Sequence, residues 1–488
     1  MNTYTQRRWN APTSILWYDL ETFGLNPRVD RIAQCSMIRT DLDLNEIGEP
    51  IKLYCRLTDD YLPNPESCLV TGITPDVCNE LGMNEFDFIT AINDEMLVPG
   101  TITAGYNNTG FDDECIRACL YRNLMDPYER ENREGRGRWD ILNLVRACHD
   151  LRPEGINFST INPESGYTSF KLTDITAENG IEQVGAHDAL VDVIATIEVA
   201  RLIKTKQPRL FDYAFRHRTK YDIWKLVDMQ GHKPILHTLG FYSSEFSDVN
   251  RAYEVKRSNT HPLLPLWRSS EKSNDLWCFD MTKKIPESIE SIEDMRDAGF
   301  MKIQANRCPF VSPLSVLTPA IEERLGYTRE HVEAIEKDIK QNHRWMFDLS
   351  PLFENKAEFE KETDEDYTIY DSFASQTDKN LMKHLSLMTA EEKISRPLNF
   401  EDTKYHKLVW RQVARNWPEA LSEKEKAQWK NFCASRLINP PSKYALTFEY
   451  YMRTCEDGMN SLETDPEAKM VYKKLKDWGL HLQETILK

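Results

Sequence analysis

Residues 14–24 combine an apolar run with two acids, and this segment constrains the fold more than any other. Residues 15–18 are apolar and aromatic, which is typical of a buried β-strand. Asp19 and Glu21 lie two residues apart, so an extended backbone projects both carboxylates from the same face. Gly24 then ends the predicted strand. The segment therefore predicts a core strand whose end presents two acids side by side.

Two further segments place acids and a histidine at the starts of predicted helices. Asp112 lies in the first turn of a helix predicted from residue 111, where a carboxylate tends to stay ionised. Asp192 lies inside a helix predicted from about residue 188 to 203, and His187 lies just before it. Each feature alone is usually structural: a solvated strand end, a helix cap or a packed histidine. Together they form a set of oxygen ligands of the kind that Mg²⁺ takes, with one titratable base.

These segments make the chain resemble the DEDDh (DnaQ-like) 3′→5′ exonuclease superfamily and, within it, the exonuclease I family. Other segments that match the family are Asp59–Pro63, Thr71–Pro75, Arg138–Asp140, Leu151–Asn157 and Gln207–Tyr213. The resemblance is dense over residues 12–216 and thins afterwards to patches such as Asn306–Pro309, Arg324–Gly326 and Arg415–Pro418.

The resemblance implies an α/β fold with three domains. We expect a ribonuclease H-like DEDDh exonuclease domain over residues 12–206, with a mixed sheet and flanking helices. An SH3-like β domain with helical additions follows over residues 207–355, and a helical domain over residues 356–488. The chain itself favours these seams, because 204–209 is polar with a proline and 354–366 is a charged run.

Local patterns predict several elements in the second and third domains. Helices are expected at Leu210–Met229, Lys404–Arg415, Glu423–Ser435 and Ala468–Leu487, and strands at Trp277–Asp280 and Phe300–Gln304.

The resemblance also implies a chemistry. Asp19, Glu21 and Asp192 would hold two Mg²⁺ ions, which Mn²⁺ can replace, and Asp112 would complete the cluster. His187 would take a proton from the attacking water. The expected activity is hydrolysis of single-stranded DNA from the 3′ end to 5′-mononucleotides, in DNA repair and recombination.

The resemblance also predicts which residues contact the nucleic acid, and several of them have an alternative explanation. The expected substrate contacts are Glu21, Lys171, Thr22, Phe23, Arg117, Tyr128 and Arg146. Lys171 keeps a positive charge where the family also has arginine, but it lacks the bidentate fork. Phe23 is equally well explained as a core residue, and Arg117 and Arg146 as ordinary charges on a helix surface.

Exonuclease I proteins bind the acidic C-terminal tail of single-strand DNA-binding protein, and this predicts the same partner here. Arg152 and Tyr213 stand in the matching motifs, whereas Thr318 stands where a basic residue is expected. The alternative for Tyr213 is simple helix packing.

Two other functions stay open from the sequence. One is a DEDDh exonuclease that acts on RNA or on duplex 3′ ends, although the long chain after Gln207 argues against it. The other is a catalytically silent DNA-binding scaffold, which the presence of all five site residues disfavours.

Composition limits the setting in which the protein works. The net charge of −17 excludes a general nucleic-acid coat, so we expect a basic groove in an acidic body, with the acids at solvated stretches such as 354–366 and 419–425. The sequence has no apolar run long enough for a membrane span, and residues 1–12 lack a signal-peptide core. The eleven cysteines include no CxxC pair. These features predict a reduced, cytoplasmic protein, and the family build predicts a monomer.

Overall fold

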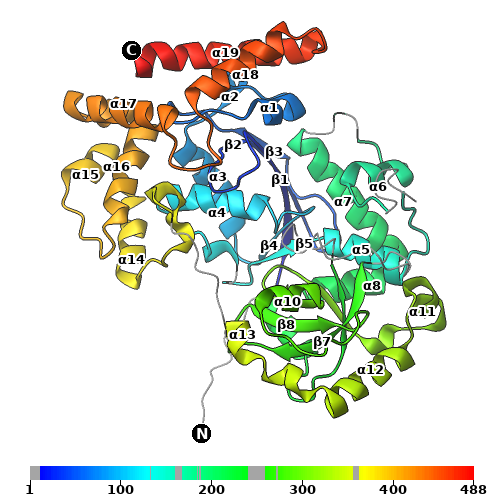
Figure 1. Ribbon diagram of the computed structural model, residues 1–488. Helices are drawn as coiled ribbons and strands as arrows, with labels where there is room; N and C mark the ends of the chain where they lie inside the picture. The colour runs from blue at the N-terminus through cyan, green and yellow to red at the C-terminus, as the bar shows by residue number, and fades with distance from the viewer. Residues whose placement is uncertain are drawn as a thin grey trace.

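The structure is a computed structural model. It describes residues 11–131, 133–159, 168–183, 185, 188–239, 259–270, 273–354 and 362–488. Figure 1 shows three bodies: a central sheet with its helices, a second sheet drawn in green, and a helical body drawn in yellow to red.

The first body is built on a mixed five-stranded sheet with strand order β3-β2-β1-β4-β5. β1 pairs antiparallel with β2, which pairs antiparallel with β3, whereas β1, β4 and β5 run parallel. The strands are β1 (Ser14–Thr22), β2 (Ile32–Thr40), β3 (Ile51–Tyr54), β4 (Thr101–Gly105) and β5 (Gly137–Asp140). The mixed sheet with flanking helices that was expected is confirmed.

Helices cover both faces of this sheet (Figure 1). The helices of this body are α1 (Pro65–Thr71), α2 (Pro75–Leu81), α3 (Glu85–Leu97), α4 (Asp112–Arg122), α5 (Leu142–Leu151), α6 (Leu172–Glu178) and α7 (Ala189–Lys206). Of these, α1 and α2 lie beside α19 (Pro466–Leu482) of the third body (Figure 1). The short 3₁₀ turn Glu129–Glu131 follows α4.

The central strand β1 is buried on both faces, which explains its continuous apolar run. Leu16 and Tyr18 pack in the core cluster that contains residues of α3 and α4. Ile15 and Trp17 pack in the cluster that contains residues of α5 and α7. Because side chains alternate along a strand, the odd-numbered positions of β1 face α7. This alternation decides which helix the two acids of β1 meet.

The second body holds an antiparallel sheet with strand order β10-β6-β7-β8-β9. Its strands are β6 (Ile235–Thr238), β7 (Thr260–Trp267), β8 (Asp275–Asp280), β9 (Phe300–Gln304) and β10 (Phe310–Pro313). The accompanying helices are α8 (Pro208–Arg216), α9 (Lys220–Leu226), α10 (Ile292–Asp297), α11 (Pro319–Leu325), α12 (Arg329–Asn342) and α13 (Ser350–Glu354), with 3₁₀ turns at Leu314–Val316 and Arg344–Asp348.

Both predicted strands of this body are confirmed, as β8 and β9, but the single helix predicted over residues 210–229 is wrong. The chain forms α8 and α9 instead, because Thr219 adopts an extended conformation and its hydroxyl caps α9 by accepting from the backbone N–H of Asp222.

The third body is helical, as expected. It contains the 3₁₀ helix η4 (Glu365–Tyr370) and the helices α14 (Gln376–Leu385), α15 (Ala390–Ser395), α16 (Lys404–Asn416), α17 (Glu423–Ile438), α18 (Phe448–Asn460) and α19 (Pro466–Leu482). A 3₁₀ turn, Pro418–Ala420, precedes α17, and one π-helical turn, Gln483–Leu487, follows α19.

Buried ion pairs join the third body to the first. Asp60, which follows β3, and Asp366 of η4 share two arginines, Arg415 and Arg436, and Asp60 also pairs with Arg31. We call these five residues the inter-domain ion cluster. Arg415 Nη2 lies 2.8 Å from Asp60 Oδ2 and also bonds Asp366, while Arg436 Nη1 lies 2.6 Å from Asp366 Oδ2. Arg31 Nη2 lies 3.5 Å from Asp60 Oδ2.

This cluster corrects one expectation. The run 354–366 was expected to be a solvated charged linker, but Asp364 and Asp366 at its end are 8% and 1% exposed. The arginines of α16 and α17 neutralise them, and their partners lie too far along the chain to be inferred from the run itself.

All eleven cysteines are buried free thiols, in agreement with a protein without structural disulfides. Across the described ranges, no helix combines the length and the apolar character needed to cross a membrane.

Candidate active site

Asp19 and Glu21 project from the face of β1 that packs against α7. In the register with β2, Asp19 lies opposite Ser36 and Glu21 opposite Gln34, and the register shifts directly after Glu21. Glu21 is 8% exposed. The predicted side-by-side arrangement of the two carboxylates therefore follows from strand geometry, at a point where the strand reaches the edge of the core.

Asp192 reaches the same place from the first turn of α7. Ligand oxygens of Asp19, Glu21 and Asp192 all lie within 4.8 Å of one another. The start of α7 is fixed by Asp188, whose side chain accepts from the N–H of Leu190. It is also fixed by Gln34 of β2, whose Oε1 accepts from the N–H of Ala189 at 3.1 Å.

Asp112 approaches from the opposite face of the sheet, in the first turn of α4. Its Oδ1 accepts from the backbone N–H of Leu20 at 3.1 Å, so the side chain is fixed to the residue between the two acids of β1. Asp112 is 6% exposed. It lies outside the group of three described above but is close enough to raise the pKa values of Asp19 and Glu21.

Asp19, Glu21 and Asp112 lack a compensating positive charge among the residues that the structure describes. Burial, then Asp192 and Asp112, raises the pKa of Glu21 to about 8, and burial raises the pKa of Asp112 to about 8. Burial, then Asp112 and Glu21, raises the pKa of Asp19 well above its usual range. In the described part of the chain, no arginine or lysine lies within ion-pair distance of Asp19, Glu21 or Asp112.

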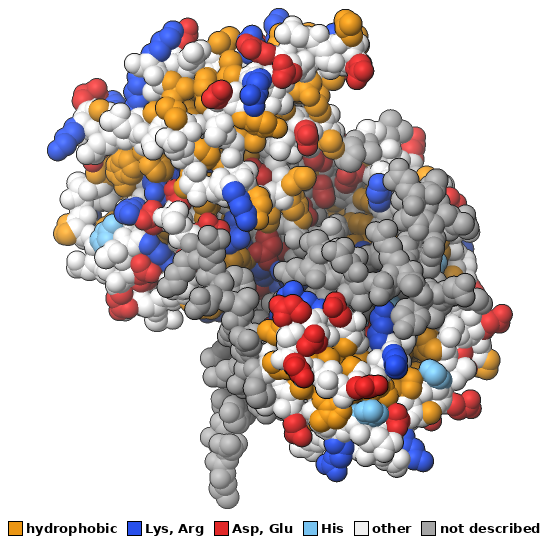
Figure 2. All heavy atoms as spheres, viewed as in Figure 1, with side chains coloured by type: hydrophobic (Ala, Val, Ile, Leu, Met, Phe, Trp, Pro, Cys, Tyr) orange, Lys and Arg blue, Asp and Glu red, His pale blue; other side chains and the backbone are white. Residues whose placement is uncertain are grey.

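Such a donor set fits a hard divalent cation. The ligands are carboxylate oxygens, they converge, and their mutual repulsion is relieved when a cation binds between them. Figure 2 shows that this face of the molecule is hollowed between the helical body at the top and the second sheet below, with acidic side chains in the hollow.

Asp113, the next residue of α4, has the opposite environment. Its carboxylate accepts from Tyr18 Oη at 2.7 Å, from Arg130 Nη2 at 2.7 Å and from Arg138 Nη1 at 2.8 Å. The two arginines hold the pKa of Asp113 well below its usual range. Sequence reasoning missed this residue, although Arg138 stands in one of the matching segments. Asp113 anchors the turn that presents Asp112.

His187 lies outside the described residues, so its role as the base stays a prediction.

The two predicted contacts that follow Glu21 are turned inward. The hydroxyl of Thr22 donates to the carbonyl of Gly24 at 2.7 Å. Phe23 is 1% exposed and belongs to a core cluster with residues of the third body, such as Trp478. This burial agrees with the core alternative, and stacking of Phe23 on a nucleotide stays a prediction.

Arg117 and Tyr128 lie together where the first and third bodies meet. Arg117 Nε donates to Glu131 at 2.8 Å, a second bond joins it to Glu114, and its guanidinium lies 5.4 Å from the centre of the Tyr128 ring. The Tyr128 ring meets Phe373 edge-on at 5.9 Å, and Phe373 is 78% exposed. Arg117 is thus held by internal glutamates, and substrate contact at this position stays a prediction.

Arg146 and Lys171 differ from Arg117 because neither is within ion-pair distance of an acid in the residues that the structure describes. Arg146 Nη1 donates to Asn143 Oδ1 at 3.0 Å, and burial lowers the pKa of its guanidinium. Lys171 is exposed at the N-cap of α6. Both keep positive charge for an anionic ligand, which suits their predicted roles.

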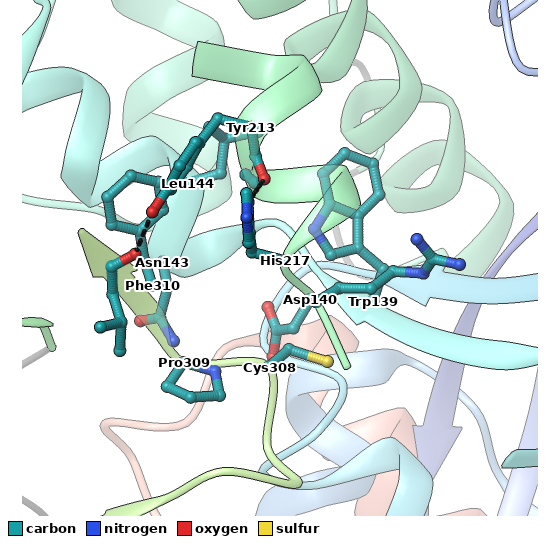
Figure 3. Close-up of a pocket in the computed structure, with 12 residues that line it drawn as sticks. Trp139, Asp140, Asn143, Leu144, Tyr213, His217, Cys308, Pro309 and Phe310 are labelled. Atoms are coloured by element: carbon teal, nitrogen blue, oxygen red, sulfur yellow. Dashed lines mark hydrogen bonds between the residues drawn. The ribbon is translucent and has the colours of Figure 1, made fainter. Parts of the chain in front are cut away.

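The predicted partner residues lie at the contact between the first and second bodies. Tyr213 donates its hydroxyl to the carbonyl of Val311 at 2.9 Å, and its ring centre lies 5.8 Å from that of Phe310. Figure 3 shows Tyr213 and Phe310 among the residues that line a pocket. Burial raises the pKa of Tyr213 to about 12. Arg152 caps the end of α5 and donates to the carbonyl of Leu151 at 2.6 Å. Tyr213 therefore packs internally on one side while lining a small pocket.

A mixed sheet whose central strand and flanking helices bring acids together defines this protein as a ribonuclease H-like exonuclease, and the family described as Exonuclease matches residues 16–200. The Exonuclease I SH3-like domain matches residues 218–355 and the Exonuclease I C-terminal domain matches residues 363–482. The chain belongs to the exonuclease I family.

Curated relatives and solved structures agree with this membership. The chain is 38% identical over 434 residues to exodeoxyribonuclease I of Buchnera aphidicola from Schizaphis graminum, covering 87% of each chain. It is 36% identical over 432 residues to exodeoxyribonuclease I of Escherichia coli K12, covering 86% of this chain and 88% of the relative. The crystal structure of E. coli exonuclease I with a dA16 oligonucleotide superposes with a TM-score of 0.86 at 33% identity, covering 96% of this chain and 100% of the other. Membership implies dependence on a divalent metal.

Proposed function

We propose that the protein hydrolyses single-stranded DNA from its 3′ end and releases 5′-mononucleotides, in DNA repair and recombination. The observation that carries this proposal is the convergence of Asp19, Glu21 and Asp192 in a chain that is similar over most of its length to exodeoxyribonuclease I. Crystals of the E. coli relative contain single-stranded oligonucleotides, which supports the same substrate class here. We also propose that the protein works as a monomer in the cytoplasm.

We further propose that the metal is Mg²⁺, replaceable by Mn²⁺, and that two ions are held by Asp19, Glu21 and Asp192. A zinc-bound form of the E. coli relative supports a cation site in this family. When bound, two such ions supply charge stabilisation for the attacking and leaving oxygens of an in-line displacement.

The side chains around that cluster have distinct tasks. Asp112, fixed by the N–H of Leu20, adds a fourth carboxylate to the cluster from the α4 side. His187 takes a proton from the attacking water, since an imidazole with a pKa of roughly 6.5 is an effective base near neutral pH. Arg146 and Lys171, which no acid within ion-pair distance neutralises among the described residues, bind phosphates of the strand.

An RNA substrate is the second candidate, because oligoribonucleases are also related to the chain. The oligoribonuclease of Chromobacterium violaceum is 26% identical over 195 residues. That match covers 38% of this chain, whereas exodeoxyribonuclease I matches extend through all three bodies. The larger match favours single-stranded DNA.

We propose domain boundaries at residues 12–206, 207–355 and 356–488. The seams suit the structure, since α7 ends at Lys206 and the third body begins with η4 after residue 364.

We also propose that the acidic tail of single-strand DNA-binding protein docks near Arg152 and Tyr213. A crystal structure of SSB/Exonuclease I with an inhibitor supports such a partner in the family. An acidic peptide labelled with fluorescein should bind the purified chain and lose affinity in Arg152→Ala. Equal affinity in the variant would remove Arg152 from the proposal.

The function is tested by digesting 5′-labelled single-stranded DNA with Mg²⁺, beside matched duplex DNA and RNA. We expect a ladder that shortens from the 3′ end on single-stranded DNA alone, absent with EDTA and in Asp192→Asn. Asp477→Asn, an acid-to-amide change at an exposed position of α19, serves as the matched control and should stay active. Equal attack on RNA would favour the oligoribonuclease-like alternative.

A further inference from the structure

Gln183 lies in the segment between α6 and α7 and touches the proposed metal cluster from outside. Its Nε2 donates to Asp192 Oδ1 at 2.6 Å, and its Oε1 accepts from the hydroxyl of Thr176 at 2.7 Å. The amide thus bridges α6, which carries Thr176, and α7, which carries Asp192. Nothing in the sequence pattern singled out this glutamine.

Geometry fixes the orientation of the amide. With the amide reversed, an amide oxygen would lie 2.6 Å from a carboxylate oxygen, and the two would repel. Thr176 is itself fixed, because it is 1% exposed and its hydroxyl also lies within 3.0 Å of the carbonyls of Leu172 and Thr173. The amide is therefore held at both ends.

A carboxylate can accept this bond and still bind a cation. It has two oxygens and about four lone-pair positions, so one N–H bond leaves capacity for a metal ligand. Carboxylates that bind metals are commonly oriented by such outer hydrogen bonds, and removing one costs about 10–100-fold in metal affinity or activity.

We propose that Gln183 is a positioning residue that orients the carboxylate of Asp192 for metal binding, an inference that rests on the proposed function. The start of α7 is held by a second contact, since Lys52 Nζ lies 2.6 Å from Asp188 Oδ2. Gln183 therefore links α6, which begins just after Lys171, to Asp192 of α7.

The test is a calorimetric titration of the metal-free, full-length chain with Mn²⁺. Gln183→Met keeps the side-chain length without either hydrogen bond, and Thr176→Val removes only the distant bond. We expect Gln183→Met to weaken Mn²⁺ binding about 10–100-fold, with an unchanged melting temperature in EDTA and near-normal kcat at saturating Mn²⁺. Thr176→Val should show a smaller loss, and Gln376→Met, an exposed glutamine of α14, none.

Asp192→Asn separates the two possible failures. If Asp192→Asn loses Mn²⁺ binding while Gln183→Met and Thr176→Val bind as the wild type does, Gln183 has no positioning role and the ligand set stands. If Asp192→Asn binds Mn²⁺ as the wild type does, the ligand set of the proposed function is wrong. If Gln183→Met lowers the melting temperature in EDTA, the Mn²⁺ affinity of Thr176→Val becomes the test. An affinity equal to that of the wild type in Thr176→Val would then overturn the inference.

Discussion

The active-site acids and the inter-domain ion cluster both bury carboxylates, yet their pKa values move in opposite directions. Burial and neighbouring acids raise the pKa of Glu21 to about 8. Asp60 is just as buried, but Arg415, Arg31 and Arg436 hold its pKa well below its usual range. The difference is the balancing charge. Arginines supply it to Asp60, whereas no arginine or lysine of the described residues lies within ion-pair distance of Glu21, an arrangement that fits a bound cation.

The same contrast occurs within one helix turn. Asp112 and Asp113 are adjacent in α4, and burial raises the pKa of the first while arginines lower that of the second. Asp113 fixes the helix and Asp112 faces the site. A buried acid with no cation beside it among the described residues is therefore a better candidate for a functional residue here than burial or acidity alone would indicate.

The largest effect is expected from neutralising an acid of the candidate active site, which tests whether these acids bind a metal. We expect Asp19→Asn to reduce hydrolysis of single-stranded DNA by more than ~100-fold, since loss of a ligand should exceed the effect of an outer-shell change. Its folding should be intact, because the change removes a repelling charge from the cluster. Single-turnover digestion and a melting curve in EDTA measure the two effects. Wild-type rates in Asp19→Asn would contradict the assignment.

The same chemical change in the inter-domain ion cluster should act on stability instead. Asp366→Asn leaves Arg415 and Arg436 with one buried acid fewer, and breaking such a pair costs about 3–5 kcal/mol of unfolding free energy. Urea unfolding of the third body, followed by tryptophan fluorescence, measures this loss. At temperatures where the variant stays folded, its metal affinity should equal that of the wild type. A stable Asp366→Asn variant would show that the arginines do not depend on this acid.

The two regions also differ in how far the sequence predicts them. The spacing of Asp19 and Glu21 predicts their shared face, and the sequence places Asp112 in the first turn of one predicted helix and Asp192 inside another. These are local rules, and the structure brings Asp19, Glu21 and Asp192 together. Whether these residues act as ligands stays a prediction that the experiments above test.

Such local rules do not predict the inter-domain ion cluster. Asp60 and Arg415 are 355 residues apart, so no window of sequence contains both. From its local sequence, the run that ends at Asp366 is expected to be a solvated linker, and Arg117 a surface charge or a nucleic-acid contact. Only the packed structure shows the arginines and glutamates that neutralise them.

Acid pH should weaken the inter-domain ion cluster, as it should weaken the pairing of Asp113 with its arginines. The pKa values of Asp60 and Asp366 lie well below the usual range. Beside the cluster, Glu85 lies 3.8 Å from Arg31 and bonds Arg122 at 2.8 Å, and its pKa is lowered to about 2. Folded pKa values below the unfolded ones of about 4 mean that the unfolded state binds more protons in this window. Their stabilisation is therefore complete above pH ~5 and lost progressively as the pH falls from ~4.

Urea midpoints measured between pH 7 and pH 3 check this expectation. The wild type should lose stability steeply below pH ~4, and Asp366→Asn should show a shallower loss because one of the titrating acids is gone. Parallel curves for the two proteins would mean that acid unfolding starts elsewhere.

Lys393 extends the comparison from buried acids to a buried cation, and its replacement has the smallest expected effect. It is 2% exposed, and its Nζ lies 4.6 and 4.5 Å from the ring centres of Phe86 and Trp417. Burial lowers the pKa of Lys393 to about 8. Aromatic rings and the amide oxygen of Gln412, which lies 3.2 Å from Nζ, thus take the place that carboxylates hold around Arg415. A cation–π contact supplies about 0.5–2 kcal/mol, less than a full counter-charge would.

We therefore expect Lys393→Met, which keeps the apolar stem, to raise the unfolding free energy at pH 7 by about 1 kcal/mol. Between pH 8 and roughly 10.4 the unfolded wild type binds more protons than the folded state, so wild-type stability rises with pH and the advantage of the variant shrinks. Urea unfolding at pH 7 and pH 10 measures the difference. If Lys393→Met is less stable than the wild type at pH 7, the rings compensate the buried charge fully. The rule that a buried charge needs a counter-charge would then hold for the acids of this protein and not for its lysine.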